Sequence, residues 1–560
     1  MSSRTQSPIF DNGHREEELN DSSSDIEWSG GETSDEEIDE PTNRPWFSVY
    51  PPEDDSVVFN PVFTAVPGPK GIPPNVRSPV DFFYLFLTPD LLNRWVEETE
   101  RYAASSIAQS MPLSPHARAR DWNWPERPHE VKVRELKAFI GLNLLMGVLK
   151  LPAIEDYWSK KHQLIELHGF SETMYLKQFQ LLLRYFHTSN NALEPPRDSP
   201  DADPLFKVRH TVNELNELFR RYYQPHENVA VDESMVPYQG HHEAVQFMPN
   251  KRHARFGPKL WVLADEKQYI FAFDLYRGKR CTRVSEHGLT FDVVTALVRP
   301  LQGMGYHVFT DNFYTSPTLF RSLEEWGLKA TGTVKANRSG LPQQLKQKKP
   351  AQGECSYMRQ SFLLAAKYRD KKEIMLLSTA CPAAMSAPRG GRGQEMPVII
   401  STYNRGKGHV DCADQKIVEY AAERRTVKLW KKITFHLLDR CLLNAHVLYE
   451  ASGLPHRPRK DFILEVISSL VTPQRTVHQQ RLKRRRVTTG REQDKAAMAD
   501  SDPRSWHFGR NIAKDGKRER QPLCVCCKER KSGFECPSCP SVPALCRDPC
   551  FKNYHFQCFR

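Results

Sequence analysis

Apolar side chains recur at three- and four-residue intervals in several segments before residue 224, a spacing that predicts amphipathic helices. The first helix is expected to begin at Pro89, because Thr88 is a favourable N-cap and proline fits the first helical position. The other predicted helices span residues 135–150, 176–187 and 212–223. The pattern therefore predicts an all-α lobe in the N-terminal part of the chain.

Between residues 229 and 334 the pattern changes to short β-branched and aromatic runs, which predict strands. The predicted strands cover residues 229–232, 259–264, 269–276, 308–311 and 330–334. Predicted helices follow at about residues 317–326, from about residue 411, and at 428–452. This order resembles an α/β ribonuclease-H-like core, in which a meander carries one carboxylate and a central strand carries a second.

The rest of the chain has a different composition in each segment. Residues 1–77 combine many acidic and proline residues with few apolar ones, which predicts a disordered acidic tail. Residues 336–400 contain short strand-like runs and predict a β-rich insertion, whereas residues 456–520 predict a basic linker. The expected domains are a tail (1–77), a helical lobe (78–226), a catalytic core (227–335 and 401–455), an insertion (336–400), a linker (456–520) and a cysteine-rich module (521–560).

Charge is divided unevenly along the chain, whose formal net charge is +11. Residues 1–60 hold 16 acidic and 3 basic side chains, so the remaining 500 residues hold 52 acidic and 76 basic ones. A basic body favours an anionic partner, and nucleic acid is the commonest one. The run Arg481–Arg486 predicts a nuclear import signal or a contact to DNA phosphates, although a plain solvated linker would look the same.

The chain lacks the segments that membrane insertion or secretion requires. It has no run of 18 apolar residues, and its first ten residues lack the apolar core of a signal peptide. We therefore expect an intracellular, soluble protein without a membrane partner, located in the nucleus.

Four aspartates are candidates for metal-dependent chemistry. Asp232 and Asp311 each follow a predicted strand, and Asp411 and Asp414 would share one face of a helix. Converging carboxylates repel unless cations lie among them, and Mg²⁺ or Mn²⁺ prefers such oxygen ligands. Two such ions suit displacement reactions at phosphorus. Asp265, in a predicted turn, and Asp274, within a predicted strand, are the competing candidates.

Cysteines cluster at the C-terminal end, where 8 of the 13 lie between Cys524 and Cys558. Their spacing with one histidine offers eight ligands, the number that two tetrahedral Zn²⁺ sites need. The expected cross-brace places Cys524, Cys527, Cys546 and Cys550 on one ion, and Cys536, Cys539, His555 and Cys558 on the other. Cys526 is left over and could replace a neighbour. A disulfide framework is the weaker alternative, because we expect an intracellular protein and the cysteines are clustered in one segment.

Several long sequence motifs resemble those of the piggyBac transposase family. VAVDESMVPYQG, VFTDNFYTS and YNRGKGHVDCADQ are similar to the three catalytic motifs of the family, and RRTVKLWKKITFHLLDR to the end of its core. The resemblance runs from about Pro79 to Arg560 and implies that Asp232, Asp311 and Asp411 are catalytic, with Asp414 helping to hold metal. It also implies that Trp430 lies beside the active site. His409 stands where the family commonly has glycine, and the effect of this difference is open.

The resemblance implies a cut-and-paste DNA transposase that nicks terminal inverted repeats, forms DNA hairpins and joins the ends to TTAA target DNA. It further implies two Mg²⁺ or Mn²⁺ ions, a homodimer, a helical lobe used for dimerisation and DNA binding, and a zinc module that binds terminal DNA. The residues expected to contact DNA are Lys251, Arg252, Arg255, Lys259, Arg338 and Trp430.

Two other classes of function compete with this hypothesis. A domesticated relative would bind DNA or chromatin without transposition, but a pure binder has no chemical need for four converging carboxylates. A zinc-containing ubiquitin ligase or histone-tail reader would explain the cysteines but not the 400 residues ahead of them.

Overall fold

The computed structural model describes residues 44–51, 54, 58–109, 131–161, 166–249, 251, 254–282, 284–386, 395–421, 426, 428–499, 510–511, 522–537, 539, 541–551 and 553–554. The predicted sites at Arg252, His555 and Cys558, and the acidic residues 1–43, lie outside this range. The chain divides into two compact units, residues 1–156 with 177–471, and residues 157–176 with 472–560.

The helices predicted ahead of the strands are confirmed in the first unit. The helix that begins at Pro89 continues to Gln109, and Oγ1 of Thr88 caps it by accepting a hydrogen bond of 3.1 Å from the Leu91 amide. Apolar faces of these helices form a core, in which Trp95, Phe139 and Phe186 are fully buried. The helices are α1 (Pro79–Tyr84), α2 (Pro89–Gln109), α4 (Val133–Val148), α6 (Leu176–Tyr185) and α7 (Phe206–Tyr222).

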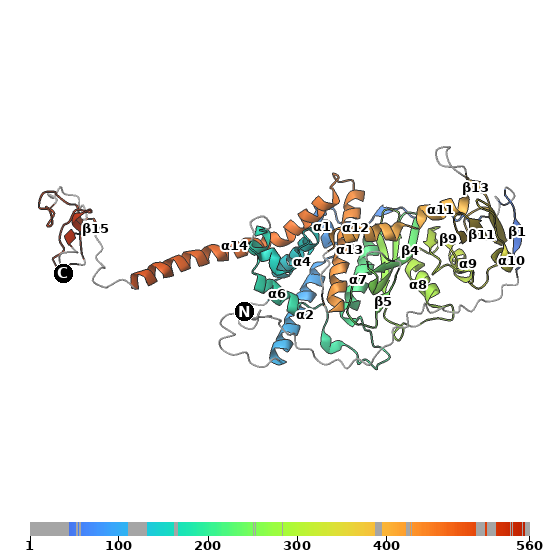
Figure 1. Cartoon of the computed structure of the whole chain (residues 1–560), viewed down its shortest axis with the longest axis horizontal. Coiled ribbons are helices and arrows are strands. Elements are labelled where there is room, and N and C mark those ends of the chain that lie inside the picture. Colours follow the sequence, from blue (N-terminus) through green and yellow to red (C-terminus); the bar gives the residue numbers. More distant parts are fainter. Residues whose placement is uncertain are drawn as a thin grey trace, which may run out of the picture. The chain divides into compact units, whose positions relative to one another are not determined.

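A ten-stranded mixed sheet is the second main part of the first unit (Figure 1). Its order is β1-β10-β11-β12-β9-β8-β4-β6-β5, where β5 is Val245–Phe247, and β7 also pairs with β6. The central strands are β4 (Asn228–Met235), β6 (Phe256–Asp265), β7 (Ile270–Leu275), β8 (His307–Thr310) and β9 (Lys329–Thr333). β4 runs parallel to β8, and β8 runs parallel to β9, whereas β4, β6 and β7 form an antiparallel meander. The predicted strands and the hairpin are therefore confirmed.

Helices that follow the strands pack against this sheet. α12 contacts β4 and β6, α11 contacts β9 and β12, and α9 contacts β9 and β11. The long helix α13 contacts α1, α7 and α12. Their bounds are α8 (Leu289–Val298), α9 (Pro317–Glu325), α10 (Gln343–Gln347), α11 (Val398–Gly406), α12 (His409–Tyr420) and α13 (Leu429–Ala451).

The predicted β-rich insertion extends the main sheet. Residues Leu376 to Ser378 of β12 pair antiparallel with β9, because β9 offers an open edge of backbone donors and acceptors. The strands involved are β10 (Cys355–Gln360), β11 (Leu363–Arg369) and β12 (Glu373–Ser378). Two short strands, β13 (Met385–Ser386) and β14 (Met396–Pro397), pair with each other.

The prediction that the whole of residues 1–77 is disordered is wrong for its C-terminal part. β1 (Phe47–Val49) pairs with β10, and β2 (Gly68–Pro69) pairs with β3 (Tyr223–Gln224). Asp54 is buried and forms an ion pair with the fully buried Arg359. Amino-acid composition does not predict these contacts. The strand pairing uses backbone groups and the ion pair uses one charged side chain of this segment, so few apolar side chains are needed.

A second difference concerns the predicted linker at residues 456–520. Helix α14 (Arg459–Ala499) occupies its first part, with Pro473 inside the helix. Phe462, Val466 and Leu470 of this helix are buried in the first unit. Arg, Lys, Gln and Leu are good helix formers, so the later residues can stay helical without an apolar stripe. Among the described residues, no helix has the length and apolarity needed to cross a membrane.

The second unit contains the later part of α14, helix α5 (His168–Thr173), strands β15 (Arg510–Asn511) and β16 (Phe534–Glu535), and the cysteine-rich module. Helix α5 lies within residues 157–176, where Glu172 forms an ion pair with Arg475. Strand β15 pairs with β16. The module around Cys524, Cys536 and Leu545 has a small buried core.

Candidate functional site

The point where β4 and β8 separate brings two of the predicted aspartates together. The parallel pairing of these strands ends at Val231 and Thr310, and the next residues are Asp232 and Asp311. Asp311 follows the end of β8 as expected, whereas β4 continues beyond Asp232 and stays paired with β6. Asp232 therefore lies at the edge that β4 exposes once β8 has left it.

Glu233 is a third carboxylate at this point, and the sequence analysis did not identify it. Ligand oxygens of Asp232, Glu233 and Asp311 all lie within 4.8 Å of one another. The hydroxyl of Tyr314, which is fully buried, donates a hydrogen bond of 3.0 Å to Oε2 of Glu233. Strict strand alternation places neighbours on opposite faces, so Glu233 was not expected beside Asp232. The adjacency of Asp and Glu in VAVDES was the only sequence signal for it.

Lysine charges balance this cluster. Nζ of Lys251 lies 3.2 Å from Oδ1 of Asp411 and 3.7 Å from Oδ2 of Asp232. Burial opposes charging of this lysine, but Asp232 and Asp411 outweigh it and raise the pKa of Lys251. Lys251 thereby links Asp411, in the first turn of α12, to Asp232 on β4.

The protonation of the carboxylates reflects their crowding. Burial, and then the charge of Glu233, hold the pKa of Asp232 well above its ordinary value. The same two causes raise the pKa of Asp311 to about 6. Burial also acts on Glu233, but Lys259 and the neighbouring hydrogen bonds lower the pKa of Glu233 overall. The three carboxylates repel one another, and a divalent cation bound among them would reduce this repulsion.

Asp414 has a different environment from Asp411. Its Oδ1 accepts a hydrogen bond of 2.7 Å from the Ser234 hydroxyl and lies 3.6 Å from Nη2 of Arg440. Arg440 is fully buried and also donates a hydrogen bond of 2.6 Å to Ser234. Asp414 therefore ties α12 to β4 and α13 beside the cluster.

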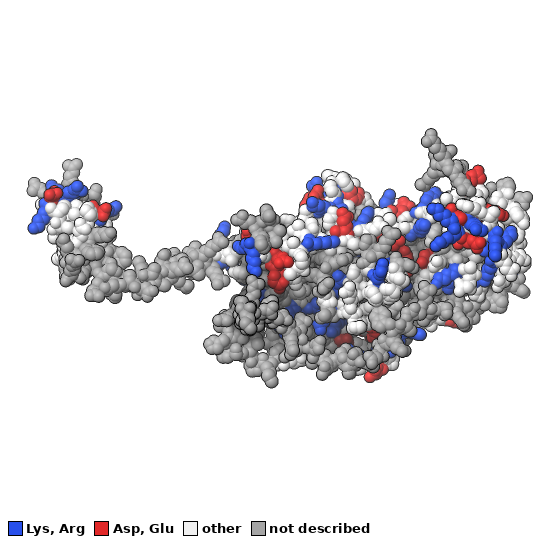
Figure 2. Space-filling view, viewed as in Figure 1, with Lys and Arg blue, Asp and Glu red and all other residues white. Residues whose placement is uncertain are grey.

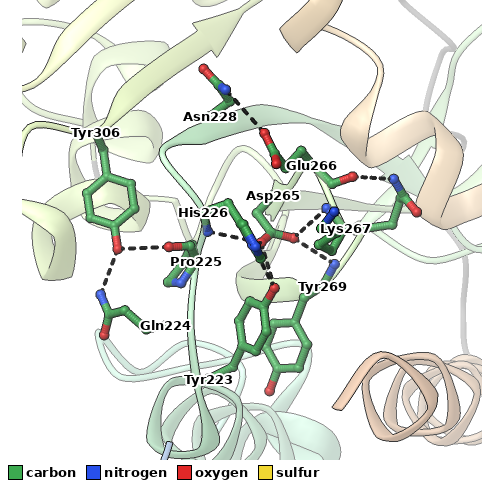
Figure 3. A network of polar contacts seen from close by, with 11 residues as sticks. Tyr223, Gln224, Pro225, His226, Asn228, Asp265, Glu266, Lys267, Tyr269 and Tyr306 are labelled. Carbon is green, nitrogen blue, oxygen red and sulfur yellow. Dashed lines mark hydrogen bonds and ion pairs between the residues drawn. The ribbon is translucent and has the colours of Figure 1, made fainter. Parts of the chain in front are cut away.

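Asp265, the first competing aspartate, is occupied by donors around a turn (Figure 3). Its Oδ2 accepts hydrogen bonds from the Tyr223 hydroxyl, the His226 amide and the His226 ring at 2.8, 3.1 and 2.9 Å. Its Oδ1 accepts from the amides of Lys267 and Tyr269 at 3.0 and 3.1 Å. This fully buried carboxylate therefore fixes the β6–β7 hairpin, as its position in a turn predicted.

Asp274, the second competing aspartate, pairs with Arg209 at 3.0 Å. Its side chain is 45% exposed, and it is not a member of the carboxylate cluster. Neither competing aspartate therefore joins the site.

The residues predicted to contact DNA fall into different environments. Arg255 is exposed, and Nζ of Lys259 lies 4.3 Å from the ring centroid of Phe313. The Arg338 guanidinium donates a hydrogen bond of 2.6 Å to the Phe313 carbonyl, which ties it to the segment after Asp311. Trp430 is half-buried, with its ring centroid 4.8 Å from that of His187 and 6.1 Å from that of Phe186.

His409 opens α12 and is buried. Its side chain is therefore packed inside the protein, and burial lowers the pKa of His409. Its effect on the site would act through packing of α12.

Four of the predicted zinc ligands converge in the second unit. The sulfur atoms of Cys524, Cys527, Cys546 and Cys550 all lie within 4.8 Å of one another, as the predicted pairing required. Burial opposes ionisation of Cys524, but backbone hydrogen bonds from Cys527 and Cys546 lower the pKa of its thiol to about 6. A four-sulfur set of this kind fits tetrahedral Zn²⁺.

The remaining cysteines of the module are separate from this set. Cys536 and Cys539 are buried, and their predicted partners lie outside the described residues. Cys526 is half-buried and is not part of the four-sulfur cluster.

Comparison with known proteins places these observations in a family. A family model described as transposase IS4 matches residues 78–446, and one described as a DDE_Tnp_1-like zinc finger matches residues 504–556. A cryo-EM structure of a piggyBac transposase synaptic complex with hairpin DNA has a similar fold, with a TM-score of 0.65 and 21% identity. That match covers 86% of this chain and 98% of the other.

Human relatives show the same affiliation. PiggyBac transposable element-derived protein 2 is 25% identical over 391 residues, which are 66% of this chain and 61% of the relative. PiggyBac transposable element-derived protein 3 is 26% identical over 409 residues, which are 69% of this chain and 64% of the relative. The chain thus spans less than two thirds of the length of these relatives. Together with the family model, which matches most of the chain, they show that this protein belongs to the piggyBac transposase family.

Proposed function

We propose that this protein is a metal-dependent cut-and-paste DNA transposase with a ribonuclease-H-like catalytic core. The observation that carries the proposal is the convergence of Asp232, Glu233 and Asp311 where β4 and β8 separate, with Lys251 linking this cluster to Asp411. The strand order β7-β6-β4-β8-β9 supports the proposed core type, because its antiparallel meander leads into parallel central strands.

Asp232, Asp311 and Asp411 would hold two Mg²⁺ or Mn²⁺ ions, with Asp414 in support. When bound, such ions activate the attacking oxygen and stabilise the leaving oxygen at phosphorus. Among the protein's own groups, Lys251 and Lys259 lie beside the carboxylates and are suited to hold the phosphate that reacts. The tie between Asp414, Ser234 and Arg440 would keep α12, and with it Asp411, aligned with β4.

The proposed substrate is double-stranded DNA, as terminal inverted repeats and as a TTAA target. The similar solved structure is that of a synaptic complex with hairpin DNA, which supports nicking, hairpin formation and strand transfer as the proposed sequence of steps. Figure 2 shows Lys and Arg side chains gathered over the region of α10 and β11, which supports an anionic partner on this face. Processing two ends requires two active sites, so we propose a homodimer that acts in the nucleus.

The zinc module is proposed to recognise terminal DNA. Lys528, Arg530, Lys531 and Arg547 are exposed, and Figure 2 shows Lys and Arg side chains on the surface of this module. Zn²⁺ would supply most of the folding energy of this module, since its own core is small.

A domesticated DNA-binding protein without transposition is the second candidate. The human relatives are named as proteins derived from transposable elements, which favours this possibility. The carboxylate cluster favours the enzyme, because binding alone gives no reason to crowd these charges.

An excision assay separates the two candidates. A donor plasmid carrying a marker between the cognate terminal repeats, recovered from the flanking genomic sequence, would be co-expressed with the full chain. We expect marker excision that restores TTAA at the donor site. Binding of the repeats without excision would support the domesticated protein instead.

A further inference from the structure

Two phenylalanines are exposed side by side on the hairpin that carries Lys251. β5 (Val245–Phe247) pairs antiparallel with the start of β6, and Phe247 lies directly opposite Phe256. Their ring centroids are 4.5 Å apart with an interplanar angle of 33°. Phe247 is 46% exposed and Phe256 is 40% exposed, so both rings present apolar surface to solvent. We name Phe247 and Phe256 the aromatic pair.

The backbone holds this aromatic pair in a fixed position. The Tyr238 amide donates a hydrogen bond of 3.0 Å to the Phe256 carbonyl, and the Met248 amide donates one of 2.8 Å to the Arg255 carbonyl. Gly257 has φ +154°, and a Cβ there would lie 1.7 Å from the Val236 carbonyl oxygen. Only glycine permits this close approach, which clamps the start of β6 against the segment after β4.

The same hairpin reaches the carboxylate cluster. Lys251 follows Phe247 by four residues and contacts Asp411 and Asp232. A chain of four residues spans at most about 14 Å, so the backbone of Phe247 lies within that distance of the Lys251 backbone. Arg255 precedes Phe256 and is exposed. The hairpin thus carries the two rings, the exposed Arg255 and the lysine that contacts the proposed reaction centre.

We propose that the aromatic pair is a stacking platform for an unpaired nucleobase of the DNA end that is being processed. This inference rests on the proposed function, in which a DNA strand folds back on itself and its terminal nucleotides must leave the duplex stack. Exposed aromatic rings flanked by Lys or Arg are the surface that binds single-stranded nucleic acid, since every base has a face that can stack. Lys251 and Arg255 supply the cations for the adjoining phosphates.

The half-buried Trp430 offers less surface for this role. It packs against Phe186 and His187 of the helical lobe. The aromatic pair is therefore better exposed than Trp430.

The test compares full-length proteins that all carry Asp311→Asn, which prevents cleavage during binding. The probes are a DNA duplex with a short unpaired end containing 2-aminopurine and the fully paired duplex. We expect the parent protein to quench 2-aminopurine in the unpaired end. The double variant Phe247→Leu/Phe256→Leu, which keeps apolar bulk, should lose this quenching. Its affinity for the unpaired end should fall about tenfold, with little change for paired DNA.

Two further variants separate stacking from folding. Phe247→Tyr/Phe256→Tyr keeps the rings and should behave as the parent. Phe47→Leu changes another exposed phenylalanine, 53% exposed on β1, and should have no effect on either probe.

Several results would overturn the inference. Unchanged quenching and affinity in the leucine variant would do so, as would an equal loss of affinity for both DNAs. A shift of the leucine variant from dimer to monomer would show that a second copy covers the aromatic pair. If the parent bound neither DNA, the proposed function itself would fail. If proteins with intact Asp311 cleaved DNA equally well with and without the two leucine substitutions, only this inference would fail.

Discussion

The hydroxyl of Tyr314 donates a hydrogen bond of 3.0 Å to the carboxylate of Glu233, and both residues are buried. Tyr314 lies three residues after Asp311, and Glu233 directly follows Asp232. This hydrogen bond therefore joins β4 to the segment that follows β8, and these two segments carry the central carboxylates. It constrains Glu233 beside Asp232 and Asp311, where their oxygens converge.

Removing the charge of Glu233 should impair the site without unfolding the protein. Glu233→Gln keeps the shape and an acceptor for Tyr314, so we expect DNA cleavage to fall about 10- to 100-fold, as for groups that orient metal ligands. Tyr314→Phe should lower it by a smaller factor, since the carboxylate remains. Rates of nicking in Mg²⁺ measure the effect, and melting temperature serves as the folding control. Full activity of Glu233→Gln would show that this carboxylate is incidental.

Lys251 should compete with divalent cations for the carboxylates it contacts. In Lys251→Met, Asp232 and Asp411 lose this positive charge, so we expect Mn²⁺ to bind roughly tenfold more tightly, as measured by calorimetry. Lys251→Arg keeps the charge and should bind Mn²⁺ much as the parent does. Weaker Mn²⁺ binding by Lys251→Met would mean that the lysine and the metal do not share this position.

The ion pair between Asp54 and Arg359 should hold the N-terminal segment on the sheet. Both side chains are buried, so Asp54→Ala leaves an uncompensated charge and should lower the free energy of unfolding by about 3–5 kcal/mol. Asp370→Ala removes an exposed aspartate from the turn between β11 and β12, and should change the free energy of unfolding by less than about 0.5 kcal/mol. Denaturant titration of both variants measures the difference. Equal changes in the free energy of unfolding for the two variants would show that the ion pair of Asp54 does not stabilise the fold.

Two matched cysteine variants test the four-sulfur cluster. Cys524→Ser should lower the zinc content by about one ion per chain and make the module sensitive to protease, because metal binding and folding are coupled. Cys526→Ser alters the neighbouring cysteine outside the cluster and should retain the zinc. Zinc release measured by a chromogenic chelator, together with limited proteolysis, checks both. Retention of all zinc by Cys524→Ser would contradict the ligand assignment.

The sequence was most informative where periodicity and motif agreed. Runs such as Val229–Asp232 and Val308–Asp311 predicted strands because their β-branched and aromatic residues fit a buried sheet, and both strands are present. The helix spacing of Asp411 and Asp414 was also confirmed by α12. Their separate environments, one beside Lys251 and one beside Arg440, depend on contacts between distant segments. A local pattern does not contain those contacts.

Three features of the structure differ from the sequence-based prediction, each for a physical reason. Glu233 was not predicted because alternation places it on the face opposite Asp232, whereas the oxygens of both residues converge with Asp311 where β4 has lost β8. The N-terminal strand β1 was missed because edge pairing uses backbone hydrogen bonds, which any sequence can provide. Residues 456–520 were predicted to form a linker because apolar periodicity is lost after residue 470, whereas helix propensity can maintain α14 without that periodicity.

The most direct test of the account is Mg²⁺-dependent cleavage of terminal-repeat DNA by the full chain and by Asp311→Asn. Asp311 stands at the end of β8, within 4.8 Å of the other cluster oxygens, and the substitution removes a charge at nearly constant volume. The account predicts nicking by the parent in Mg²⁺ and none in EDTA, with no cleavage but near-normal DNA affinity for Asp311→Asn. Cleavage by Asp311→Asn at the parent rate would contradict it.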